Sequence, residues 1–263
     1  MNRYQVRHQS NTWRHKYDLV CVLVARDFKL RYKRSILGIA WSLLVPLAQL
    51  VVLYVVFSGM VPLNIPHYTT FLFTGILPWT WLQASLLVSA MTVVDNRDLV
   101  KQVGFPLPLL PVVTVLSHLV HFLLALPILA VFLVNDGYRP NASLAALPLI
   151  ILVQFLFVSS LAYIVATLQV RFRDTQYLLG IALFLFFYLT PVFWDVNAVP
   201  EPYHSIMLMN PVAMILDGYR AVLMRGVWPE PFPLLGVAGL SVIVLTLACT
   251  AFNLVRHRFV EEL

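Results

Sequence analysis

No Asp, Glu, Lys or Arg occurs from Ser35 to Val94, an uncharged run of 60 residues. As a single α-helix this run would be about 90 Å long, whereas one bilayer crossing needs about 20 residues. The run therefore predicts two membrane-spanning helices joined by a short link. Composition agrees, because 60% of the residues are hydrophobic and 11% are charged, against roughly 25% charged residues in a soluble domain. We expect an all-α, polytopic membrane protein.

Six segments are apolar enough to cross a membrane, and none of them contains a charged residue. Their approximate bounds are 36–58, 69–94, 108–134, 144–170, 177–194 and 233–255. The chain thus divides into an N-terminal segment, residues 1–34, and a six-span domain, residues 35–263.

The basic residues are distributed unevenly about these spans. All but three of the 18 Lys and Arg residues fall on one side of the predicted topology, and nine of them precede position 35. The three on the opposite side are Arg139, Arg220 and Arg225. Because cytoplasmic loops carry the excess of basic residues, we expect both termini in the cytoplasm. The gathering of cations beside a membrane segment indicates attraction to membrane lipid and not to nucleic acid.

The residues before the first span predict an amphipathic helix that lies in the plane of the membrane. One helical stripe is apolar or aromatic: Tyr17, Cys21, Val24, Phe28 and Tyr32. Five basic residues lie among the last nine positions of this segment, 26–34: Arg26, Lys29, Arg31, Lys33 and Arg34. We expect the stripe to enter the acyl boundary while the cations face anionic headgroups. The alternative is a plain anchor that only sets the orientation of the first span.

The region between the last two spans contains a second helix with clear end signals. Asn210 is a good N-cap, Pro211 suits the first helical position, and Gly226 suits the C-terminal stop. The helix between them has about 14 residues, too few to cross a membrane. With the apolar piece "YHSIMLMN" before it, it predicts a re-entrant helical hairpin that would act as a lid. An interfacial outer loop is the alternative. The candidate gate residues are Asn210, Pro211, Met214, Asp217 and Arg220.

Several energy sources have no signature in this sequence. None of the four lysines follows a glycine, so the phosphate-binding loop G-x-x-x-x-G-K-[ST] does not occur. No predicted span holds a carboxylate of the kind that relays ions in coupled carriers. His118 and His121 lie one turn apart and form either a relay or a packing contact. We assign no catalytic residue, cofactor, metal site or disulfide to the chain, and expect a partner to supply the energy.

Five sequence stretches, in this order, resemble the ABC-2 type permeases that export O-antigen, capsule and teichoic acid. They are "RDFKLRYKRSILGIAW", "LFTGILPWTWLQASL", "NRDLVKQVGFPLPLLP", "RFRDTQ" and "NPVAMILDGYRAVL". The resemblance covers nearly the whole chain. It implies a homodimer of six-span subunits in the bacterial inner membrane, with two copies of a cytoplasmic ATPase that binds ATP and Mg²⁺. The substrate that it implies is a lipid-linked polysaccharide.

By the same resemblance, residues 95–104 form the segment that seats in a groove of the ATPase. Its charged residues are Asp95, Arg97, Asp98 and Lys101; an ordinary solvated loop would look similar. Arg173 and Asp174 match the family's Arg-Asp pair between spans four and five, where an ion pair and a coupling role are both open. Spans one and five would line a channel between the subunits. Its candidate aromatic residues are Tyr54, Phe57, Phe184, Phe187, Tyr188 and Trp194, unless these rings face lipid.

Other functions remain open at this stage. The chain could be an exporter of small molecules within the same family, or a membrane-embedded glycosyl or acyl transferase. The transferase would need acidic or histidine residues that converge at a membrane face, and the charge-free spans disfavour an ion-coupled carrier. The sequence does not identify the glycan.

Overall fold

The computed structural model describes residues 12–32, 35, 37–38, 40–61, 63–102, 104–196, 199–200 and 209–262. Within these ranges the chain is helical and contains no strand. The helices are α1 (Thr12–Tyr32), α2 (Ala40–Tyr54), α3 (Tyr68–Asp95), α4 (Arg97–Val100), α5 (Leu109–Asn135), α6 (Leu147–Arg171), α7 (Thr175–Leu189), α9 (Pro211–Arg220) and α10 (Pro231–Glu262). Shorter turns extend three of them: π-helical Val55–Met60 after α2, 3₁₀ Ala142–Ala146 before α6, and π-helical Ala221–Arg225 after α9.

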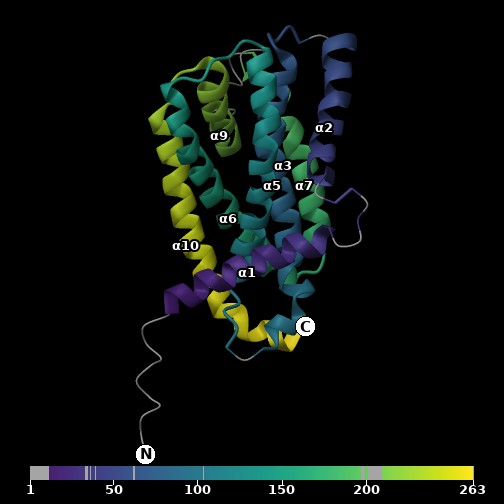
Figure 1. Ribbon diagram of the computed structural model, residues 1–263. Helices are drawn as coiled ribbons and strands as arrows, with labels where there is room; N and C mark the ends of the chain where they lie inside the picture. Colours follow the sequence, from purple (N-terminus) through teal and green to yellow (C-terminus); the bar gives the residue numbers. More distant parts are fainter. Residues whose placement is uncertain are drawn as a thin grey trace, which may run out of the picture.

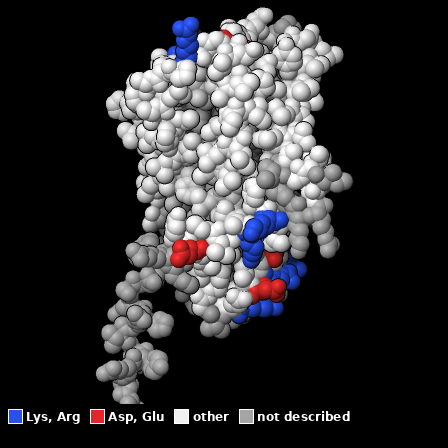
Figure 2. Space-filling model, viewed as in Figure 1, with Lys and Arg blue, Asp and Glu red and all other residues white. Residues whose placement is uncertain are grey.

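The long helices stand side by side in an upright bundle, and α1 lies across one end of it (Figure 1). The same end holds α4 and the C-terminal part of α10 (Figure 1). We call it the α1 end, and the opposite end, where α9 lies, the α9 end. Figure 2 shows Lys, Arg, Asp and Glu side chains gathered near the α1 end, with a smaller group at the α9 end and an uncharged surface between.

Five helical segments are long and apolar enough to cross a membrane: 40–60, 68–95, 109–135, 142–171 and 231–255. They correspond to five of the six predicted spans. Residues 177–194, the remaining prediction, instead begin in α7, which has 15 residues and ends at Leu189. Thr190 is extended, with φ −100° and ψ 139°. The residue before a proline avoids the helical region, so Pro191 explains why the helix ends earlier than predicted.

The core is built around α3, which packs against α2, α5, α6, α7 and α9. Leu72, Phe73 and Ile76 on this helix are completely buried. A smaller apolar cluster lies toward the α1 end, where Val93 meets Tyr163 of α6 and Phe252 of α10. These two clusters hold the bundle together along its length.

Helix α1 packs against α5. Leu23 is the α1 side chain buried there, at 4% exposed, whereas Tyr17 is 70% exposed and Cys21 is also exposed. The predicted apolar stripe is therefore divided: Tyr17 and Cys21 are exposed, whereas Val24 and Phe28 are half-buried. Its first members remain accessible on the surface of the protein.

Candidate functional site

At the α1 end, a hydrogen bond joins α1 to the link between α3 and α5. The Arg26 guanidinium donates to the side-chain oxygen of Asn96 at 2.8 Å, and the Asn96 amide donates to the Thr92 carbonyl at 2.8 Å. Arg26 also lies 3.2 Å from the Asp27 carboxylate. Because Arg26 and Asn96 are 70 residues apart, this contact ties the crossing helix to the end of α3.

The link itself is anchored by one apolar side chain and exposes its charges. Val100 of α4 is 4% exposed and belongs to the smaller apolar cluster. The four predicted docking residues are exposed around it: Asp95, Arg97, Asp98 and Lys101. The structure therefore brings them together on a short helical knob that carries both signs of charge. Such a knob can contact a partner protein without exposing an apolar patch.

The turn between α6 and α7 lies close to this knob in the predicted topology and exposes Arg173 and Asp174. Gln169 holds the turn, since its amide donates to the Arg173 carbonyl at 3.0 Å and its oxygen accepts from the Gln176 backbone at 2.7 Å. Neither Arg173 nor Asp174 forms an ion pair within the described ranges. In the described part of the chain, Arg173 and Asp174 therefore do not form the ion pair that was one of the two alternatives. The coupling role stays a prediction.

A groove runs between α2 and α7, with α3 as its floor, and encloses about 410 Å³. Aromatic rings and two carboxamides line it: Gln49, Trp79, Gln83, Phe184, Phe187 and Tyr188. The ring centroids of Trp79 and Phe187 are 5.5 Å apart, and those of Phe184 and Tyr188 are 5.3 Å apart. Such edge-to-face contacts are typical of stable aromatic clusters.

The chemistry of this groove suits a ligand with both apolar faces and hydroxyl groups. Phe184 and Tyr188 are 58% and 51% exposed, so their rings are available, while Phe187 is 8% exposed and supports them from below. The carboxamides of Gln49 and Gln83 can each donate and accept hydrogen bonds. An apolar groove with a few polar groups is the usual form of a small-molecule site.

The short helix α9 begins and ends as its sequence predicts. The Asn210 side chain accepts hydrogen bonds from the backbone of Val212 at 2.9 Å and of Ala213 at 3.3 Å, and Pro211 occupies the first position. At the other end Gly226 is left-handed, with φ 66°, a conformation that glycine adopts at low cost. The predicted cap residues are thus confirmed.

Arg220 of α9 is turned into the bundle. The residue is 7% exposed, its guanidinium donates to the Val192 carbonyl at 2.8 Å, and its Cζ atom lies 3.7 Å from the centre of the Phe71 ring. Gly75 of α3 permits this approach, because an added Cβ would lie 2.4 Å from the Val192 carbonyl oxygen. The arginine therefore holds the irregular segment after α7 against α3.

Two further hydrogen bonds hold the same irregular segment. The Tyr68 hydroxyl donates to the Phe193 carbonyl at 2.9 Å, and the Asn210 amide donates to the Thr190 hydroxyl at 3.1 Å. Unpaired backbone groups are costly in an apolar medium, so the donors from Arg220 and Tyr68 explain how the Val192 and Phe193 carbonyls stay buried beyond the end of α7. We call this arrangement around residues 190–193 the α7 clamp.

The remaining gate residues have different surroundings. Met214 is half-buried and packs on the main core cluster. Asp217 is exposed and accepts two hydrogen bonds from Arg225, at 2.7 and 2.9 Å. These bonds raise the pKa of the Arg225 guanidinium above its usual value. Asp217 therefore stabilises the end of the α9 segment and leaves Arg220 as the buried cation.

Not every predicted channel residue reaches the groove. Tyr54, at the end of α2, is exposed but lies outside the groove lining. Phe57 stacks on Phe193 with centroids 5.1 Å apart, and Trp194 donates its indole hydrogen to the Tyr188 carbonyl at 3.2 Å. Both are half-buried in the α7 clamp. Their rings support the groove from its α9 end.

The predicted residues at the α1 end are only partly described. Phe28 is half-buried, with its ring stacked on His121 at 5.3 Å, and Lys29 is exposed. Arg31 belongs to α1, but its side chain lies outside the described part, as do Lys33, Arg34 and residues 201–208. The groove residues that sequence reasoning missed are Gln49, Trp79 and Gln83. For Gln49 and Gln83 the available signal was a carboxamide inside an otherwise apolar span.

The sequence was compared with those of known proteins. It matches the ABC-2 type transporter family over residues 18–224. It is 34% identical to the O-antigen export system permease protein RfbA of Myxococcus xanthus, over 93% of this chain and 95% of that protein. It is 33% identical to RfbA of Klebsiella pneumoniae, over 94% of this chain and 95% of that protein. The polysialic acid transport protein KpsM of Escherichia coli is 21% identical over 91% of this chain and 92% of its own length. The chain is an ABC-2 permease and belongs to the ABC-2 type transporter family.

Proposed function

We propose that this chain is the transmembrane subunit of an ATP-driven exporter that carries a lipid-linked, O-antigen-like polysaccharide across the bacterial inner membrane. The observation that carries the proposal is the similarity over nearly the whole chain to O-antigen export permeases, at 33–34% identity. A match of that extent includes the spans, the link and the α9 segment together. The groove between α2 and α7 agrees with it.

The groove would form one wall of the sugar path. Sugar rings present C–H faces that stack on aromatic side chains, and their hydroxyl groups pair with carboxamides. The exposed rings of Phe184 and Tyr188, beside Gln49 and Gln83, offer both kinds of contact. A single bundle fills its own centre, so the opposite wall would come from a second copy, and the working unit would be a homodimer.

In the membrane, α7 and the segment clamped after it would together make the sixth crossing. Non-helical backbone is tolerated at membrane depth where protein surrounds it, and residues 190–193 are at most 9% exposed. Six crossings would put both termini on the same side of the membrane, and the excess of basic residues at the α1 end favours the cytoplasmic side. The α9 segment would then be the second half of a re-entrant pair that closes the outer end of the path.

Energy would come from a separate ATPase bound at the α1 end. The exposed knob formed by Asp95, Arg97, Asp98 and Lys101 offers charged contacts, and Val100 fixes it to the bundle. ATP and Mg²⁺ would bind to that partner, which would drive transport through the knob. Helix α1 would lie at the inner membrane surface with its cations toward anionic headgroups.

A capsular polysaccharide is the second candidate cargo. It is favoured by the similarity to the polysialic acid transport protein KpsM, but that identity is 21%. The higher identity to the O-antigen permeases places an O-antigen-like glycan first.

Export of surface polysaccharide by the complete transporter tests the proposal. Replacing Phe184 and Tyr188 together by Ala should lower export about tenfold while the protein still inserts, because about two stacking contacts of roughly 0.5–1.5 kcal/mol each are lost. Phe232→Ala on α10, where the ring is 84% exposed, is the matched control and should leave export unchanged. Equal export by both variants would show that the groove is not part of the sugar path.

The ATPase assignment is tested separately by co-purification. Asp98→Lys combined with Lys101→Glu should release the ATPase subunit from the permease, because it reverses two of the four charges of the knob. Retention of the subunit with normal ATP hydrolysis would exclude the knob as the docking site. Hydrolysis of ATP by the permease alone would contradict the assignment of ATP hydrolysis to a separate subunit.

A further inference from the structure

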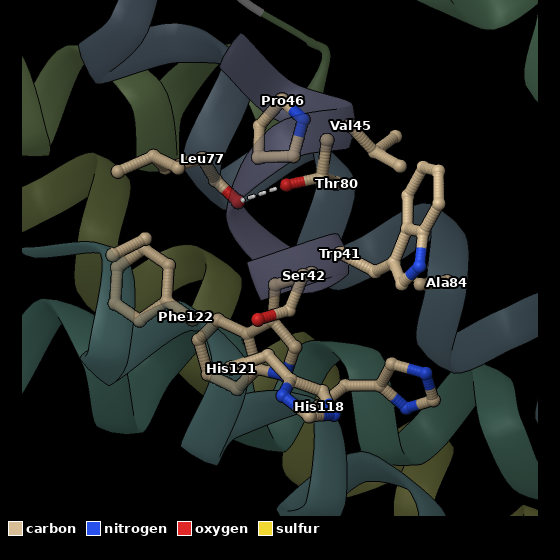
Figure 3. A pocket seen from close by; sticks show the side chains of 12 residues that line it. Trp41, Ser42, Val45, Pro46, Leu77, Thr80, Ala84, His118, His121 and Phe122 are labelled. Carbon is tan, nitrogen blue, oxygen red and sulfur yellow. Dashed lines mark hydrogen bonds between the residues drawn. The ribbon is translucent and has the colours of Figure 1, made fainter. Parts of the chain in front are cut away.

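A second cavity lies within the protomer, between α2, α3 and α5, and encloses about 350 Å³. It is separate in its lining residues from the groove beside α7. Figure 3 shows its side chains, contributed by the first turns of α2, the middle of α3 and the middle of α5. Its volume falls within the range of small-molecule sites, about 300–1,000 Å³.

The lining changes from polar to apolar along the cavity. His118, His121 and Ser42 lie together on one side, and Pro46 and Leu77 lie on the opposite side (Figure 3). Thr80, at the apolar side, donates its hydroxyl hydrogen to the Leu77 carbonyl at 2.9 Å, so it adds little polarity there. The cavity has a polar end and an apolar end.

The polar end is the one nearer to α1. The ring of Phe28 on α1 stacks on His121 with centroids 5.3 Å apart, and the two imidazoles meet edge-to-face at 6.0 Å. His118 is 3% exposed, and its Nδ1 lies 2.9 Å from the Thr114 carbonyl. That contact holds the imidazole in a fixed orientation at the cavity wall.

Positive charge accompanies this polar end. Lys29 follows Phe28 on α1, is exposed, and forms no ion pair within the described ranges. Arg26, two residues before Phe28, instead pairs with Asp27 and donates a hydrogen bond to Asn96. A negatively charged group at this end of the cavity would therefore meet the ammonium group of Lys29 and the imidazole of His121.

The cavity opens on the outer surface of the bundle beside α2. Trp41 and Val45, which line it, are 51% and 59% exposed. In a membrane this surface meets the acyl chains of the leaflet that adjoins the α1 end. An empty apolar cavity loses the dispersion contacts that a hydrocarbon chain would supply, so a lipid chain is the natural occupant.

We propose that this cavity binds an anionic phospholipid of the inner leaflet. One acyl chain lies against Pro46, Leu77 and Ala125, and the phosphate lies at the mouth, near His121 and Lys29. The order of polar and apolar groups along the cavity matches that of such a lipid, whose head faces the cytoplasm and whose chains point to the membrane centre. The lipid would fill the gap between α2 and the core and so steady the first span. It is distinct from the cargo.

Lipid retention by the purified full-length permease tests this proposal, without the ATPase. The protein is reconstituted in nanodiscs of equal phosphatidylglycerol and phosphatidylcholine, extracted in detergent, and its bound lipid is counted by native mass spectrometry. The wild type should retain phosphatidylglycerol about fivefold over phosphatidylcholine. Equal retention of the two lipids would overturn the proposal.

Two variants address the two ends of the cavity. Ala84→Leu adds bulk to the lining, and His121→Ala removes a polar group at the mouth; each should lower phosphatidylglycerol retention about fivefold. Ala251→Leu, at an exposed position on α10, is the matched control and should retain the lipid. If Ala84→Leu does not fold, His121→Ala alone decides, and unchanged retention in that variant would overturn the proposal.

A third arm separates phospholipid from the lipid anchor of the cargo. Purified lipid-linked polysaccharide is added to the nanodiscs before extraction. Phosphatidylglycerol should remain bound. Its displacement by the glycolipid would assign the cavity to the cargo anchor and overturn the assignment to bulk phospholipid. Unchanged export in the groove variants would count against the proposed function alone.

Discussion

Helices α2 and α3 are neighbours, and the more apolar of the two is the less buried. The α2 segment has a mean hydropathy of 2.2 with 11% of that window buried, whereas α3 has a mean hydropathy of 1.4 with 72% buried. In lipid an apolar side chain gains little by moving from acyl chains to protein, so hydropathy does not select the core. Small and polar residues do, since they permit close approach and form hydrogen bonds.

The contrast shows which helix faces are buried inside the bundle and which are left exposed. Helix α3 carries Thr70, Gly75 and Ser85, all buried, and receives α9 and the α7 clamp. Helices α2 and α7 instead expose large apolar side chains such as Val52 and Ile181. Those exposed faces are where lipid or a second copy of the chain would pack. Four substitutions probe the difference, in order of decreasing effect.

Of these four substitutions Arg220→Ala should have the largest effect, because its side chain is buried and holds the α7 clamp. It removes the hydrogen bond to the Val192 carbonyl and the contact with the Phe71 ring. We expect the free energy of unfolding in detergent to fall by about 2–4 kcal/mol, from the lost packing and the unsatisfied carbonyl. Arg139→Ala, at an exposed arginine, should change it little. If Arg220→Ala lowered the free energy of unfolding no more than Arg139→Ala does, the α7 clamp would not depend on Arg220.

Gly75→Leu tests the close approach between α3 and residues 190–193. The added Cβ would lie 2.4 Å from the Val192 carbonyl oxygen, so the segment must move. Overpacking of this kind costs about 1–3 kcal/mol, which thermal unfolding in detergent would report. Gly236→Leu, where no neighbouring atom lies within 4 Å, is the control. Equal stability of the two variants would mean that the clamp tolerates side chains at position 75.

Asp217→Asn addresses a surface ion pair at the same end of the molecule. The pair with Arg225 is about half-exposed on both sides, and exposed pairs contribute about 0–1 kcal/mol. We expect a loss of roughly 0.5 kcal/mol that disappears in high salt, as measured by thermal unfolding at two ionic strengths. A loss as large as that of Arg220→Ala would contradict the distinction between the buried and exposed cations.

Phe184→Ala should have the smallest effect on stability, because its ring is 58% exposed on α7. Detergent or lipid can replace most of its contacts, so we expect a change below about 0.5 kcal/mol. Phe187→Ala, at a ring 8% exposed on the same helix, is the contrast and should cost about 3–5 kcal/mol. Similar losses of stability in the two variants would show that burial of a ring on α7 does not decide how much it stabilises the protein.

Local signals in the sequence predicted much of this molecule. The uncharged run from Ser35 to Val94 predicted two spans, and Asn210, Pro211 and Gly226 predicted the ends of α9, because caps act through the nearest backbone groups. The exposed link with Asp95 and Lys101 was also predicted, since charges are excluded from the spans. Each of these inferences needs only neighbouring residues.

The groove could be predicted only in part. Phe184, Phe187 and Tyr188 were candidates, but Trp79 and Gln83 of α3 were not, because nothing in the sequence says that α3 forms the floor beneath α7. Tyr54 was a candidate by its position in a span, yet its direction around α2 places it outside the groove lining. Helical periodicity cannot settle which face meets which neighbour when every face is apolar.

The amino-acid sequence by itself determined that the chain is a multi-span helical membrane protein without a nucleotide-binding loop, because charge and hydropathy act residue by residue. Only the tertiary structure decided that α7 stops at Leu189 and that Arg220 turns inward. The physical reason is that the carbonyls of Val192 and Phe193 need donors from α9 and α3, and Gly75 must leave room for this segment. Those partners lie far away in the sequence, so they meet only when the bundle packs.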